Sequence, residues 1–109
     1  MSVYVDDMEA PFGRMIMCHM IADTHRELVE MAERIGVQRK WVQCYGHAKE
    51  HFDICKAMRA KAVRLGAVEV TMFGLADIIS TRRFRGEPAE MAYYEREHAD
   101  LPVLQAWGS

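Results

Sequence analysis

Apolar and polar residues repeat along this chain with changing periods, and these periods predict its secondary structure. An almost unbroken apolar run over residues 15–22 is typical of a strand that is covered on both faces. Apolar positions recur at i, i+3, i+4 and i+7 from Leu28 to Ile35, which predicts an amphipathic helix. Other strands are predicted over residues 2–5, 41–45 and 67–71, and other helices over residues 54–65, 73–82 and 89–98.

Single residues mark several boundaries of these elements. Thr24 and Glu27 have the spacing of a capping box, and Gly36 is the residue expected just after the first helix. Asp53 is placed to cap the second helix, which is its simplest role. His25 lies in the first turn of the first helix, where we expect a solvated surface residue.

The order of the elements predicts an α/β fold, with a small mixed, partly parallel sheet of about four strands and helices packed on it. A turn over residues 10–13 joins the first two strands. Helices connect the second strand to the third and the third to the fourth, so these neighbours are expected to run parallel.

Length and composition predict one globular domain over residues 1–109, in which half of the residues are hydrophobic and 28% are charged. No apolar run approaches the roughly 20 residues that a bilayer requires, so no membrane contact is expected. The N-terminus carries Asp6, Asp7 and Glu9 where a signal peptide would be basic, and the three cysteines form no CxxC pair. These features predict a cytoplasmic protein with reduced thiols.

Charge is segregated along the chain. Residues 34–85 hold eleven Lys or Arg against four Asp or Glu, a net +7, whereas residues 1–33 and 86–109 have net charges of −5 and −4. A basic middle suits a phosphate-bearing ligand, although the acidic ends could instead fold over it and neutralise it. Duplex DNA is an unfavourable partner, because the acidic flanks would repel a long polyanion.

The histidines, acids and bases near the apolar run 15–22 support three readings. In the first, basic side chains hold a phosphate and other polar residues orient the rest of the ligand; this ligand-binding set is Arg14, His19, Asp23, His51, Lys56 and Arg59. In the second, a divalent metal ion is bound and activates water against a phosphoester; its ligands would come from Asp6, His19, Asp23, His51 and Asp53. In the third, the same residues bond to the backbone, cap helices or form a solvated face.

Nucleophilic catalysis is disfavoured. Cys18 and His19 are adjacent, and adjacent residues of a strand point to opposite faces, so they cannot form a catalytic pair. The sequence has no GxSxG, P-loop or GxGxxG motif.

Several short motifs together resemble an uncharacterised bacterial and phage family, domain of unknown function 4031. The resemblance covers residues 2–72 and rests on Val3-Tyr4-Val5-Asp6, Gly13-Arg14, His19, Asp23-Thr24, Glu27-Leu28, Gly36, His51-Phe52-Asp53-Ile54 and Gly66-Ala67. Residues 73–109 would then be a helical extension of this family-like core. Some family members are joined to an HD-type phosphohydrolase domain, so the resemblance implies nucleotides or other phosphorylated metabolites as ligands.

Three hypotheses for function follow. The first is a module that binds a phosphorylated small molecule, specifically a nucleotide, and that would sequester a nucleotide signal in a phage. The second is a metal-dependent phosphoesterase or nuclease. The third is a structural interaction protein that uses the apolar residues 101–107, a segment that would also serve for homo-oligomerisation.

Overall fold

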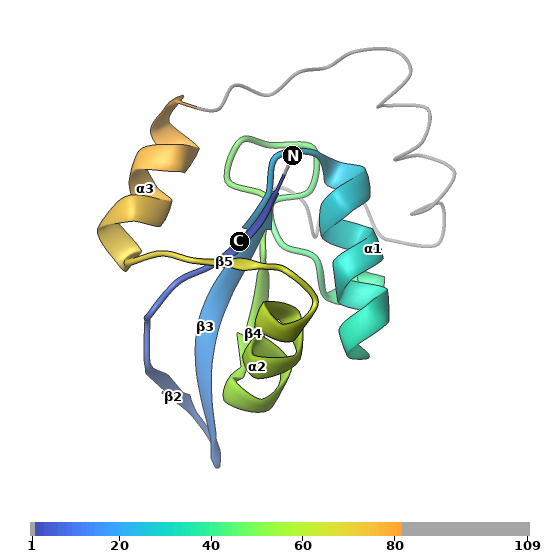
Figure 1. Cartoon of the computed structure of the whole chain (residues 1–109), viewed down its shortest axis with the longest axis vertical. Helices are drawn as coiled ribbons and strands as arrows, with labels where there is room; N and C mark the ends of the chain where they lie inside the picture. The colour runs from blue at the N-terminus through green and yellow to red at the C-terminus, as the bar shows by residue number, and fades with distance from the viewer. Residues whose placement is uncertain (1, 82–109) are drawn as a thin grey trace.

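The longest strand, β3 (Met15–Ala22), organises the sheet in the computed structural model, which describes residues 2–81 (Figure 1). β1 (Val3–Val5) and β2 (Ala10–Phe12) both pair antiparallel with β3 along one of its edges. β2 lies within the segment predicted to be a turn, and the turn itself is shifted to Gly13, whose φ of 61° favours glycine.

The other edge of β3 is occupied by β4 (Phe52–Cys55), again antiparallel, and β5 (Val68–Glu69) pairs parallel with β1. The sheet of the described chain is therefore mixed and has five strands. The predicted α/β fold with a partly parallel sheet is confirmed.

The third strand lies elsewhere than the sequence pattern predicts. Residues 41–45 are not a strand: a 3₁₀ turn at Arg39–Trp41 leads into a loop whose one bridge to the sheet joins Gln43 to His51. β4 follows instead, within the segment predicted to enter a helix, because buried Phe52 and Ile54 alternate with polar neighbours at the period of a strand.

Asp53 is therefore a strand residue, and its predicted role as a helix cap is wrong. The second helix, α2 (Lys56–Arg64), begins directly after Cys55, which makes no capping hydrogen bond through its side chain. The prediction that the second and third strands run parallel is also wrong. After the first helix, residues 37–51 carry the chain back to the end of β3, and β4 then runs from Met20 toward Met17.

The first helix, α1 (His25–Ile35), begins and ends at the residues expected from the sequence. The Thr24 hydroxyl accepts a hydrogen bond from the Glu27 backbone amide, at 3.2 Å, and donates one to the Glu27 carboxylate, at 2.9 Å. Gly36 has a φ of 91°, and its amide bonds to backbone carbonyls of the last turn. Both predicted caps are confirmed.

Replacing Thr24 with alanine is expected to lower the free energy of unfolding by about 1 kcal/mol, because the Glu27 amide loses its acceptor. Urea denaturation of the purified chain measures this change. Thr24→Ser keeps the hydroxyl and should leave most of the stability intact, so equal losses in the two variants would contradict the capping role.

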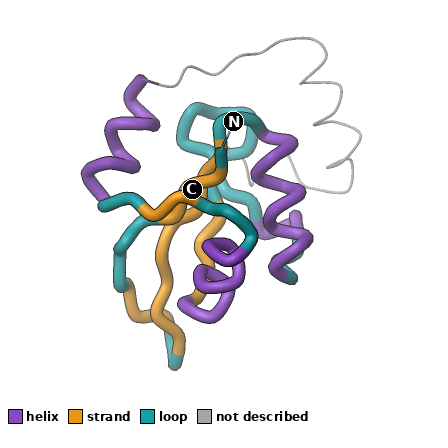
Figure 2. The backbone as a smooth tube through the Cα atoms, viewed as in Figure 1, coloured by secondary structure: helices purple, strands orange, loops and turns teal. Residues whose placement is uncertain are grey.

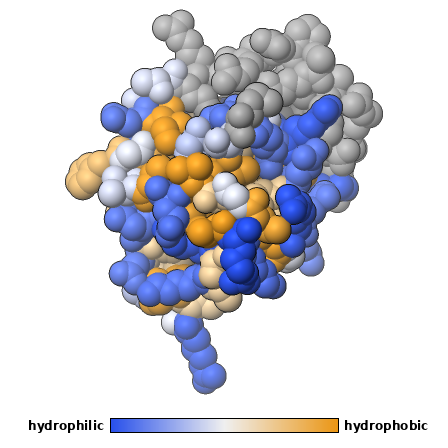
Figure 3. Space-filling view, viewed as in Figure 1, coloured by the Kyte–Doolittle hydropathy of each residue, from blue (hydrophilic) through white to orange (hydrophobic). Residues whose placement is uncertain are grey.

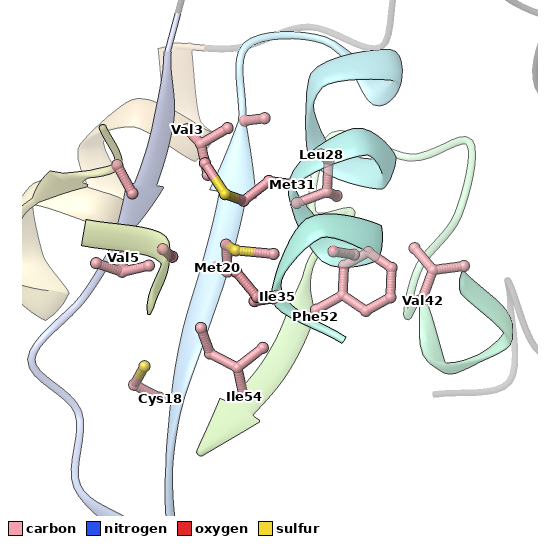
Figure 4. Close-up of a cluster of buried hydrophobic side chains, with 14 residues drawn as sticks. Val3, Val5, Cys18, Met20, Leu28, Met31, Ile35, Val42, Phe52 and Ile54 are labelled. Carbon is pink, nitrogen blue, oxygen red and sulfur yellow. The ribbon is translucent and has the colours of Figure 1, made fainter. Parts of the chain in front are cut away.

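The main core lies between one face of the sheet and the helices α1 and α2, and Figure 4 shows its side chains. Side chains along a strand point to alternate faces of the sheet, so the neighbours of a strand residue that enters this core point to the opposite face. Met20 on β3 and Phe52 and Ile54 on β4 are buried here, at 1% exposure or less. His19 and Asp53 consequently lie on the opposite face of the sheet.

A third helix, α3 (Met72–Thr81), lies on the other side of the sheet from α1 (Figures 1 and 2). Its apolar composition predicts that most of it is buried, but only Leu75 is, and Phe73 is 88% exposed. A helix that packs against a single layer can bury only one of its sides, so its other apolar residues remain on the surface. The first turn is held by Asp7, whose carboxylate accepts a hydrogen bond from the Met72 amide at 2.8 Å.

Apolar groups also reach the surface among charged ones on the face that carries α2 and β5 (Figure 3). Leu65 and Val68, near the end of α2 and in β5, are 39% and 43% exposed.

Within residues 2–81, no helix is long and apolar enough to span a bilayer. The predicted helix 89–98, the apolar segment 101–107, and Arg82, Arg83 and Arg85 of the basic middle lie outside the described residues.

Candidate metal centre

Three polar side chains meet on the face of the sheet opposite the main core. His19 on β3 is paired directly with Asp53 on β4, and His51 lies just before β4 and two residues from Asp53, so it points to the same face. One nitrogen or oxygen atom from each side chain lies within 4.8 Å of the other two. The two imidazole rings stand edge to face, with their centroids 5.3 Å apart.

Each of the three side chains is held from behind by a second group. Nδ1 of His19 lies 2.7 Å from a carboxylate oxygen of Asp6, and Nδ1 of His51 lies 2.7 Å from the backbone carbonyl of Lys49. The Gln43 side-chain amide donates a hydrogen bond to Oδ2 of Asp53, also at 2.7 Å. Such outer partners fix the orientation of metal ligands in proteins.

These partners decide which ring nitrogens carry hydrogen. A carbonyl oxygen can only accept, so Nδ1 of His51 is the donor and its Nε2 has a lone pair when the ring is neutral. The same holds for His19, because the Asp6 carboxylate accepts from its Nδ1. In their neutral forms, both rings therefore present a lone pair on Nε2 toward Asp53.

Oδ1 of Asp53 is shielded from solvent and has no hydrogen-bond partner among the described residues. It lies 3.5 Å from Nε2 of His51 and 3.9 Å from Nε2 of His19, and both distances exceed those of an ordinary N–H···O hydrogen bond. When both rings are neutral, three lone pairs thus converge with no hydrogen between them. A cation satisfies this arrangement, and two imidazoles with one carboxylate are a set that divalent transition metals bind.

Asp6 belongs to the centre as a supporting residue rather than as one of the converging ligands. It directly follows β1, is 1% exposed, and accepts hydrogen bonds from the His19 amide at 2.8 Å and the Met8 amide at 3.3 Å. With both of its oxygens engaged, its carboxylate positions the His19 ring. The sequence placed Asp6 among the candidate metal ligands; the structure places its carboxylate behind His19, outside the three converging side chains.

Asp23 lies outside the centre, at the far end of β3. It is four residues from His19, which corresponds to about 13 Å along a strand. Its carboxylate accepts hydrogen bonds from the Ser2 amide at 2.7 Å and the Tyr4 hydroxyl at 3.0 Å. Burial, followed by the hydrogen bond to Asp23, raises the pKa of Tyr4. Asp23 therefore ties the start of β1 to the end of β3.

The three basic residues expected to hold a phosphate do not meet at the two histidines. Arg14 lies in the turn between β2 and β3, roughly 16 Å along the strand from His19. Lys56 and Arg59 lie on α2, at the opposite face of the sheet, where they line a separate pocket of 340 Å³. Lys56 pairs with Glu9 at 2.6 Å, and Arg59 donates to the Asp6 backbone carbonyl and to the Glu69 carboxylate.

Cys18 also faces away from the centre, as alternation along the strand predicts. Burial, followed by the negative charge of Asp6, raises the pKa of its thiol to about 11. The thiol therefore stays protonated at neutral pH and is a poor nucleophile or metal ligand.

The loop over residues 46–50, between the 3₁₀ turn and β4, is anchored by a buried pair. Nδ1 of His25 lies 2.9 Å from the Glu50 carboxylate, which also accepts a hydrogen bond from the Gly46 amide at 3.4 Å. His25 is 3% exposed, so its predicted place on the solvated surface is wrong. The start of α1 thus holds the loop that leads to His51.

A cleft of about 590 Å³ opens beside the centre. His19 and His51 lie on its inner wall, together with His47 and Lys49 of the loop, and α3 forms the facing wall. Sequence reasoning missed Gln43, His47 and Lys49. Gln43 acts through pairing between distant segments and Lys49 through its backbone carbonyl, and neither leaves a motif in the sequence. For the side chains of His47 and Lys49, the polar loop that contains them was the available signal.

The chain matches a known protein family, and the matched residues include all of the helices and strands described above. The chain matches the model of a family described as protein of unknown function (DUF4031) over residues 3–82. It belongs to this family. The matched range of this DUF4031 protein includes the three converging side chains, Asp6 and α3, so the resemblance drawn from residues 2–72 is confirmed and continues beyond them. No curated protein and no solved structure gives a significant match.

Proposed function

We propose that this DUF4031 protein binds a divalent transition metal ion and uses a metal-bound water to hydrolyse a phosphoester of a small molecule. The ligand atoms are Nε2 of His19, Nε2 of His51 and Oδ1 of Asp53. One observation carries the proposal: these three atoms lie within 4.8 Å of one another, Oδ1 of Asp53 has no hydrogen-bond partner among the described residues, and each side chain is oriented from behind.

Three protein ligands favour a catalytic site over a structural one. Structural zinc sites are usually closed by four protein ligands, whereas catalytic sites leave coordination positions for water and substrate. Zn²⁺, Mn²⁺ and Fe²⁺ all accept imidazole and carboxylate ligands. Such an ion lowers the pKa of bound water, so that hydroxide is present near neutral pH.

The reaction then follows in one displacement. An ion held by His19, His51 and Asp53 would supply an activated water, which would give one proton to solvent and form the bond to phosphorus as the bond from phosphorus to the leaving oxygen breaks. The leaving alkoxide takes one proton from solvent. Lys49, which lines the same cleft, would add its positive charge to that of the ion in stabilising the phosphoryl oxygens.

The placement of basic residues supports a small substrate rather than a nucleic acid. Lys49 lines the cleft, but Lys56 and Arg59 line a pocket on the opposite face of the sheet, so these two bases do not extend a basic surface from the centre. The cleft volume of about 590 Å³ is in the range of sites for small molecules. We therefore assign the phosphate contact to the metal ion and Lys49.

Titration of the full chain with Mn²⁺ or Zn²⁺ tests the metal site. Calorimetry should show one ion bound per chain, and an ion concentration of 100 times Kd should stabilise the fold by about 2.7 kcal/mol. Mg²⁺ should bind far more weakly, because it prefers oxygen ligands. The Mn²⁺-loaded chain should hydrolyse p-nitrophenyl phosphate. Absence of binding contradicts the metal site, and binding without hydrolysis contradicts the enzymatic role.

A further inference from the structure

The cleft beside the metal centre has two unlike walls. The inner wall carries the two histidine ligands, with His47 and Lys49, and is polar. The facing wall belongs to α3, where the apolar residues Leu75, Ala76 and Ile79 line the cleft together with Ser80. A ligand that fills the space must therefore match a polar surface on one side and an apolar surface on the other.

Helix geometry explains the apolar wall. Residues separated by three or four positions share one side of a helix, so Leu75, Ala76 and Ile79 lie together while Asp77 lies on another side. Two adjacent residues hold both walls in place: Asp6 positions His19, and Asp7 accepts the hydrogen bond from the first amide of α3. The separation of the walls is thus set by one short segment after β1.

The volume of the cleft shows that phosphate alone does not fill it. A water molecule occupies about 30 Å³ in the liquid, so a cleft of about 590 Å³ has room for roughly twenty waters, far more than one phosphate group needs. The remaining space lies against the apolar side chains of α3.

We infer that the substrate is the phosphate ester of an alcohol with an apolar body. This inference rests on the proposed function and names its substrate class. The phosphate lies at the metal ion and Lys49, and the apolar body of the alcohol packs on Ala76 and Ile79. Removal of that body from water supplies the binding energy that distinguishes this ester from a hydrophilic one.

Two esters of primary alcohols test the inference. Hexyl phosphate and glycerol 3-phosphate have leaving groups of similar chemistry but bodies of opposite polarity, so the ratio of their kcat/KM values reports on the α3 wall. The Mn²⁺-loaded full chain should prefer hexyl phosphate by at least tenfold, since each buried methylene group contributes about fourfold.

A matched pair of variants locates the effect. Ile78 and Ile79 are both half-buried residues of α3, but of the two only Ile79 lines the cleft. Ile79→Ala should reduce the preference for hexyl phosphate severalfold with little change for glycerol 3-phosphate, and Ile78→Ala should leave the preference unchanged. Equal kcat/KM values for the two esters, or a preference that Ile79→Ala does not alter, would overturn the inference while the proposed function stands. No hydrolysis of either ester would overturn the inference, and it would overturn the proposed function as well if p-nitrophenyl phosphate is not hydrolysed either.

Discussion

Replacing Asp53 with asparagine is expected to abolish tight metal binding and, in the same protein, to stabilise the metal-free fold. The variant loses the carboxylate ligand, which should weaken Mn²⁺ or Zn²⁺ binding by at least about a hundredfold. Without metal the effect is reversed, because Oδ1 of the native side chain is buried without a hydrogen-bond partner among the described residues. An asparagine amide can donate there to Nε2 of His51 while its oxygen still accepts from Gln43.

The expected gain in stability is about 1 kcal/mol, the usual net value of one hydrogen bond. Calorimetric titration measures the loss of affinity, and urea denaturation in the presence of a chelator at pH 8 measures the gain in stability. A residue with a purely structural role would show the opposite sign in the denaturation experiment. Unchanged metal affinity would remove Asp53 from the ligand set.

Asp23→Asn is the matched control for this variant. Asp23 was part of the same predicted metal set, but its carboxylate bonds to Ser2 and Tyr4 at the other end of β3. The variant should therefore bind metal as the native protein does. A similar loss of affinity in both variants would indicate a general effect of charge rather than ligation.

Replacing Asp6 with asparagine is expected to weaken metal binding by about 10- to 100-fold although Asp6 is not one of the ligands. Oδ1 of Asp6 accepts hydrogen bonds from the His19 and Met8 amides, so the new amide group must take the position of Oδ2, next to Nδ1 of His19. An amide there donates to Nδ1. The proton of the ring then moves to Nε2, the atom that would bind the metal.

The ¹⁵N spectrum of the histidine side chains distinguishes this mechanism from a loss of structure. In the metal-free variant the protonated nitrogen of His19 should change from Nδ1 to Nε2, with a change in unfolding free energy below about 1 kcal/mol. Asp7→Asn is the neighbouring control, because its oxygen can still accept from the Met72 amide and it does not touch His19. Native affinity in the Asp6 variant, or an unchanged ring tautomer with lowered affinity, would contradict the positioning role.

Local signals in the sequence predict much of the fold. The apolar run of β3, the capping pair Thr24 and Glu27, and the helix end at Gly36 all act within a few residues, and the structure confirms each of them. Segment 51–55 shows the limit of such signals. Its apolar residues Phe52 and Ile54 fit the start of a helix as well as a strand, and pairing with β3, which is distant in the sequence, decides between the two.

The sequence by itself determined the kinds of chemistry available: histidines and carboxylates near a buried strand, and a surplus of basic residues in the middle of the chain. Only the tertiary structure decided which of these groups meet. Antiparallel pairing sets His19 opposite Asp53, and the packing of α2 on the core face of the sheet leaves Lys56 and Arg59 on the other side from them. The physical reason is that strand register and facing depend on contacts between distant segments, and a shift of one residue would move every side chain to the opposite face.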